Sequence, residues 1–88
     1  MKIVVNDGYY GYKFTIPDSV REAIGFAPNS EELREDETLI KIVEETHPVG
    51  LKVIDIPDEA TDWVVISNRV TDKEEVLYVL DGCIFVKQ

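Results

Sequence analysis

The chain has 88 residues, nine of them basic and eighteen acidic, so its formal charge at neutral pH is −9. This length fits one small domain with a single core, and a hydrophobic content of 44% separates the chain from disordered proteins of similar charge. The acidic balance excludes partners held mainly through phosphate contacts, because each such contact needs a Lys or Arg. Direct binding to DNA, RNA or an anionic membrane surface is therefore not expected.

Other features of the composition bear on where the protein works. No apolar run approaches the ~20 residues of a membrane span. The first residues lack the apolar stretch and cleavage site of a secretory signal. The single cysteine, Cys83, allows neither an internal disulfide nor a thiolate cluster for zinc. We therefore expect a cytoplasmic protein without metal or cofactor, in which packing alone holds the fold.

The first third of the chain predicts a hairpin and a short helix. Residues 2–6 predict a strand, residues 12–16 predict a second one because their apolar and polar side chains alternate, and the glycines between them suit a connection. Ser19 is followed three residues later by Glu22, which is the capping pattern of a helix start. This pattern predicts a short helix over residues 20–24, followed by a loop to residue 30.

The main helix is predicted between Asp36 and Pro48. Asp36 can cap its first turn, and Pro48 prevents its continuation. Glu37 stands four residues before Lys41, an order that stabilises a helix. The apolar residues of this segment recur with helical spacing, at Leu39, Ile40, Ile42 and Val43.

The remainder of the chain predicts strands over residues 51–56, 62–67, 75–80 and 83–86. Asp81-Gly82 separates the last two and is a strong signal for a tight hairpin turn. These runs are apolar on both faces, which indicates strands covered on both sides, or on one side by the main helix and on the other by a partner. The prediction is one α+β domain over residues 1–88, with a mostly antiparallel sheet of about five to six strands, one main helix and one short helix.

The sequence does not contain a recognisable catalytic set. His47 stands alone at the predicted helix end, where it is expected to cap carbonyls or to face solvent. Cys83 alternates with Phe85 in a strand and is expected to be a small buried hydrophobe. Phosphate-binding glycine loops, dinucleotide fingerprints and nucleophile elbows are absent from the sequence. The carboxylates of residues 55–62 lack the pattern of a helix-loop-helix calcium site, so we assign no metal and expect no enzyme.

Two features are candidates for protein binding. The first is the tyrosine cluster Tyr9, Tyr10 and Tyr12, which would mark a recognition surface if exposed, since tyrosine is enriched at binding hot spots. The alternative is that Tyr9 and Tyr12 close the core over the edge of the sheet. Both interpretations remain open at this point.

The second feature is the distribution of charge. Residues 31–62 contain eleven acidic and three basic side chains, a net charge of −8, whereas the other residues sum to −1. The main helix contributes Glu37, Glu44 and Glu45 to this acidic region. It could meet a basic partner, imitate a phosphate backbone, or only keep the protein soluble.

Several segments in a fixed order resemble a family of small proteins encoded by bacteriophages, prophages and their bacterial hosts. The matching segments are Met1 to Asn6, Tyr9 to Tyr12, Arg34-x-Asp36, Leu39-Ile40, Val43-Glu44-Glu45, Leu51-Lys52-Val53, Ile56-Pro57-Asp58 and Trp63. The chain departs from the family pattern at Tyr10, which replaces a glycine, and in a longer hairpin over residues 67–75. The resemblance implies a genomic setting and supplies no activity, substrate or cofactor.

The sequence therefore gives three functional hypotheses. The first is an accessory protein of phage or prophage type that binds another protein and has no catalytic activity. The second is an acidic nucleic-acid mimic that inhibits a host DNA-directed enzyme. The third is a small ligand-binding protein or enzyme, which would need a pocket.

Overall fold

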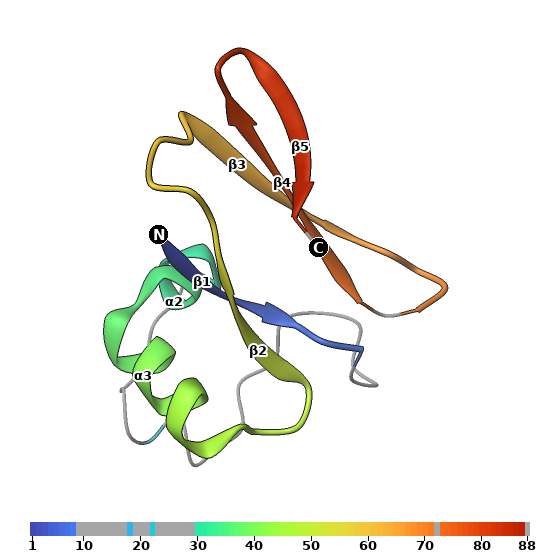
Figure 1. The fold of residues 1–88 in the computed structure, drawn as a ribbon. Helices are drawn as coiled ribbons and strands as arrows, with labels where there is room; N and C mark the ends of the chain where they lie inside the picture. The colour runs from blue at the N-terminus through green and yellow to red at the C-terminus, as the bar shows by residue number, and fades with distance from the viewer. Residues whose placement is uncertain (9–17, 19–21, 23–29, 72, 88) are drawn as a thin grey trace.

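A computed structural model of the chain describes residues 1–8, 18, 22, 30–71 and 73–87 (Figure 1). Its helices and strands are, in chain order, β1 (Lys2–Asn6), α2 (Ser30–Glu35), α3 (Glu37–Thr46), β2 (Leu51–Asp55), β3 (Asp62–Ser67), β4 (Glu74–Leu80) and β5 (Cys83–Lys87). All paired strands are antiparallel, and they form a two-stranded sheet, β1-β2, and a three-stranded sheet, β3-β4-β5. The predicted α+β class is confirmed. The predicted strand 12–16 and almost all of the predicted helix 20–24 lie outside the described residues.

The β1-β2 ribbon lies between the helices and the three-stranded sheet (Figure 1). Val4 packs into one hydrophobic cluster with α2 and α3, whereas Ile3 and Val5 pack into another with residues of β3 and β4. All three side chains are fully buried. Successive residues of a strand point to opposite faces, so a continuous apolar run is what a strand in the middle layer requires.

The main helix has the predicted limits. The Asp36 carboxylate accepts a hydrogen bond of 2.9 Å from the Leu39 backbone N–H and caps α3, which ends at Thr46, two residues before Pro48. His47 follows in the left-handed conformation and donates its backbone N–H to the carbonyl of Val43. The helix α2, which ends just before the cap, was not predicted. Leu33 of α2 is buried in the core.

A buried polar contact joins all three layers. Glu74 of β4 accepts hydrogen bonds from the Arg34 guanidinium of α2 at 2.7 Å and from the Asn6 backbone N–H of β1 at 2.8 Å. The side chains of Arg34 and Glu74 are 10% and 4% exposed. Burial shields both charges from water, which carries a desolvation penalty, and the attraction between the two charges offsets it.

The last hairpin closes as the sequence predicts. Asp81 and Gly82 have φ angles of 51° and 76°, which are the positive values of a primed two-residue turn. The closing residues Leu80 and Cys83 face each other across β4 and β5.

Candidate functional site

The outer face of the three-stranded sheet is the feature of the structure that is best suited to recognition. Leu77 of β4 lies opposite Val64 of β3 and opposite Val86 of β5, so these three side chains share one face. Because every second residue of a strand points to the same face, further aliphatic side chains of the three strands lie on this face as well. The outer face comprises Val64, Ile66, Leu77, Val79, Ile84 and Val86.

The two faces of this sheet differ in burial. Residues on the inner face, such as Val76, Trp63 and Val65, pack against the β1-β2 ribbon. On the outer face, Val64 is 51% exposed and Ile84 is 72% exposed. These side chains form one contiguous aliphatic surface, and contiguous exposed apolar surfaces are often interaction sites.

The charges of the outer face are acidic. Asp62 lies opposite Val79 at one end of the face, and Glu75 lies opposite Ile66 at the other. Both carboxylates are exposed. No strand residue assigned by the register to this face is a Lys or Arg in the described chain, so an apolar centre is flanked by negative charge.

The strand β5 exposes side chains on both of its faces. Phe85, on the inner face, stacks on Tyr78 with ring centroids 5.5 Å apart, yet it is 43% exposed. Cys83 is exposed as well, so the prediction that it is a buried hydrophobe is wrong. The ribbon packs on residues of β3 and β4, and β5 lies at the edge of the sheet beyond that contact.

His47 and Cys83 do not form a catalytic pair. His47 follows α3 at the helical end of the molecule, whereas Cys83 lies at the β4-β5 turn at the opposite end (Figure 1). His47 is exposed, as expected. It borders an open hollow of about 680 Å³ whose polar lining includes Asp7 and Lys52, joined by an ion pair at 3.3 Å.

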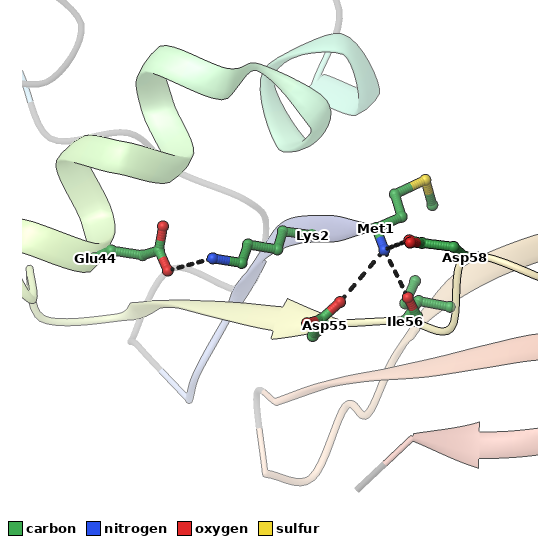
Figure 2. Close-up of polar contacts among 6 residues, drawn as sticks. All are labelled: Met1, Lys2, Glu44, Asp55, Ile56 and Asp58. Atoms are coloured by element: carbon green, nitrogen blue, oxygen red, sulfur yellow. Dashed lines mark hydrogen bonds and ion pairs between the residues drawn. The ribbon is translucent and has the colours of Figure 1, made fainter.

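The amino terminus is held at the end of the middle layer (Figure 2). The Met1 ammonium donates to the carbonyl of Ile56 at 2.7 Å and pairs with the carboxylates of Asp55 and Asp58. Its hydrogen bond to Asp58 is the main reason that the pKa of the ammonium is raised above its ordinary value of 8.0. The same bond lowers the pKa of Asp58.

The predicted acidic site residues lie on α3 and are exposed. Glu37 and Glu45 face solvent, and Glu44 pairs with Lys2 at 2.9 Å, where the hydrogen bond raises the pKa of the lysine (Figure 2). The predicted sites Tyr9, Tyr10 and Tyr12 lie outside the described residues. Part of the acidic region therefore has internal partners, because Glu44, Asp55 and Asp58 each face a cation.

Sequence reasoning did not identify the outer face. Its signal was present, since residues 63–66 and 76–80 are apolar at consecutive positions. That pattern shows that both faces of a strand are apolar, but only the packing distinguishes the covered Val65 from the exposed Val64. The sequence predicts strands covered on both sides, or by the main helix on one side and a partner on the other. In the structure the ribbon, and not the helix, covers the inner face of this sheet, and Val64 on the outer face is exposed.

Within the described part of the chain, no group of three or more His, Cys, Asp or Glu side chains has the geometry to hold a metal ion. Of the helices in that part, none is long and apolar enough to cross a membrane. No protein-family description, curated protein or solved structure matches the sequence or the fold.

Proposed function

We propose that this chain is a cytoplasmic, non-catalytic accessory protein of phage or prophage type that docks another protein on the outer face of β3-β4-β5. The exposed aliphatic surface carries the proposal. Leaving such a surface in water is unfavourable by about 25 cal/mol per Å², and a partner that covers it recovers that free energy. The phage setting is supported by the sequence resemblance.

The charge of the site specifies the partner further. Asp62 and Glu75 flank the aliphatic centre, and the chain as a whole has a charge of −9. The complementary surface has an apolar centre with Lys or Arg side chains at its rim. Attraction between rim charges accelerates the encounter, whereas the buried aliphatic contact sets the lifetime of the complex.

The acidic mimic is the competing function. It places the partner on α3, where Glu37 and Glu45 face solvent. Pairing of Glu44, Asp55 and Asp58 with cations leaves fewer free carboxylates for a phosphate-like array. We therefore favour the outer face.

Site-specific photo-cross-linking distinguishes the two surfaces. A photoreactive amino acid is placed at Val64 on the outer face, at Glu45 on α3, or at Val49 as a control that is 81% exposed and lies outside both surfaces. The variants are expressed in the bacterial host. Docking on the outer face predicts one discrete adduct from position 64, with little from positions 45 and 49. An adduct confined to position 45 would instead support the mimic.

A further inference from the structure

The free edge of β5 carries an inference that goes beyond the docking of a partner on the outer face. In the described part of the chain, β5 pairs with β4 on one side and with no strand on the other. Its side chains are exposed on both faces of the sheet, with Ile84 at 72% and Phe85 at 43%. Unpaired edges are normally protected by charges, prolines or bulges. Residues Cys83 to Val86 contain no charge and no proline, and their register with β4 is unbroken.

The register identifies which backbone groups point to the free edge. In a two-residue hairpin the closing pair, here Leu80 and Cys83, is a hydrogen-bonded pair, and the bonded positions then alternate along the strand. Cys83, Phe85 and Lys87 therefore direct their backbone groups to β4. Ile84 and Val86 direct their N–H and carbonyl groups outward, where another strand can pair with them.

We propose that a second copy of this chain occupies the edge, with β5 pairing antiparallel to β5 of its partner about a twofold axis at Phe85. In this register Ile84 of one copy forms a hydrogen-bonded pair with Val86 of the other, so both outward residues are used in each strand. The resulting sheet is continuous across the axis. It also joins the two outer faces into one larger aliphatic surface.

The side chains of β5 favour pairing with an identical strand, because no carboxylate of β5 faces its own copy. A strand with carboxylates would face identical carboxylates across a twofold axis, and like charges opposite each other are destabilising. The strand β5 has no carboxylate, and its Lys87 lies opposite Cys83 of the second copy. The other edge strand, β3, begins at the carboxylate Asp62, and its inner-face residues Trp63 and Val65 are already packed against the ribbon.

Sedimentation velocity over a series of concentrations tests the assembly. The wild-type chain is expected to approach twice its mass of 10.0 kDa and to stop there, because a twofold contact is closed. Val86→Pro removes an outward N–H, and proline is tolerated at such a position on an edge strand. This variant should remain monomeric at concentrations where the wild type is dimeric. Val64→Glu is the control, since it alters the outer face on β3, away from the edge, and should leave the dimer intact.

Oxidative cross-linking tests the register without relying on a disruptive variant. With Cys83 replaced by serine, Phe85→Cys places two thiols on the axis at a non-hydrogen-bonded pair, where a Cα separation of about 4.5 Å lies within the range of disulfides. Val70→Cys, in the same background, is the control because Val70 is 92% exposed and lies in the connection between β3 and β4, outside β5. Rapid dimer formation at position 85 alone supports the proposal. A wild-type chain that stays monomeric, a mass that rises beyond the dimer, or equal cross-linking at both positions would overturn it. None of these results alters the photo-cross-linking expected at Val64.

Discussion

Arg34 and Glu74, forty residues apart in the sequence, form an ion pair of 2.7 Å that links α2 to β4 in the interior of the protein. Glu74 also accepts the backbone N–H of Asn6, so the carboxylate joins the helical layer, the ribbon and the three-stranded sheet. The inner face of the three-stranded sheet is held against the ribbon at this point. Its outer face is left exposed.

Removing one member of this pair is expected to be costly. Glu74→Ala leaves the Arg34 charge buried without its carboxylate and should lower the free energy of unfolding by about 3–5 kcal/mol, as for other broken buried pairs. Chemical denaturation measures the change. The adjacent, exposed Glu75→Ala is the matched control and should stay within about 0.5 kcal/mol of wild type. Replacement of both members, Arg34→Met with Glu74→Leu, should cost less than the two single changes added together. Full additivity would contradict a coupled pair.

The amino-terminal contacts predict a pH dependence with two limbs. The ammonium of Met1 has a raised pKa in the folded protein. Its contribution to folding stability is therefore complete below pH 8.0 and is lost as pH rises through the raised pKa. Asp58 has a lowered pKa in the folded protein. Its contribution to folding stability is therefore complete above pH 3.8 and is lost as pH falls through the lowered pKa. The contact is therefore fully formed between these two values.

Thermal unfolding at a series of pH values tests this dependence. Asp58→Asn should reduce the loss of stability on the alkaline side and lower the melting temperature slightly at neutral pH. Glu59→Gln changes a neighbouring exposed carboxylate by the same amount of charge and serves as the control. If the two variants have the same pH profile, the contact between Met1 and Asp58 does not contribute to stability.

The cap of α3 provides a local test. Asp36→Ala removes the acceptor for the Leu39 backbone N–H and should lower the free energy of unfolding by ~1 kcal/mol. Asp36→Asn retains a side-chain oxygen that can accept the same bond, so it should remain close to wild type. Urea titration separates these outcomes, and equal destabilisation by alanine and asparagine would argue for a role of the charge rather than of the cap.

The turn between β4 and β5 tests backbone conformation without a change in packing. A Cβ added at Gly82 would meet no atom within 4 Å, but the residue has a φ of 76°. Gly82→Val should therefore destabilise the fold by about 1–2 kcal/mol through backbone strain alone. Asp81→Asn is expected to leave the stability nearly unchanged, because asparagine tolerates a positive φ. A neutral valine variant, measured by thermal unfolding, would show that the turn adopts another conformation.

Local signals account for the parts of the fold that the sequence predicts. Asp36 and Pro48 mark the limits of α3, and Asp81-Gly82 marks the last turn, because each acts on its own backbone neighbours. The helix α2 has only a weak local signal, which is the pair Glu31 and Glu32 after Ser30 in its first turn. Its Arg34 is held by a residue of β4, a contact between distant parts of the chain. A pattern of neighbouring residues cannot predict a contact between residues so far apart in the sequence.

The candidate site follows the same distinction. The sequence indicates that Val64 and Val65 are both suited to burial, and only the position of the ribbon decides which of them is covered. Cys83 was expected to be buried for the same reason, since its strand is apolar. Its exposure results from the position of β5 at the edge of the sheet.

The most direct test of the proposed function is the affinity of the photo-cross-linked partner, once purified, for two variants with the same change of charge. Val64→Glu places a carboxylate in the centre of the outer face, whereas Val49→Glu places one at an exposed position outside it. By isothermal titration calorimetry, Val64→Glu should weaken binding by more than about thirtyfold, which corresponds to the ~2 kcal/mol of a binding hot spot. Val49→Glu should bind as the wild type does. Equal affinities of the two variants would contradict docking on the outer face.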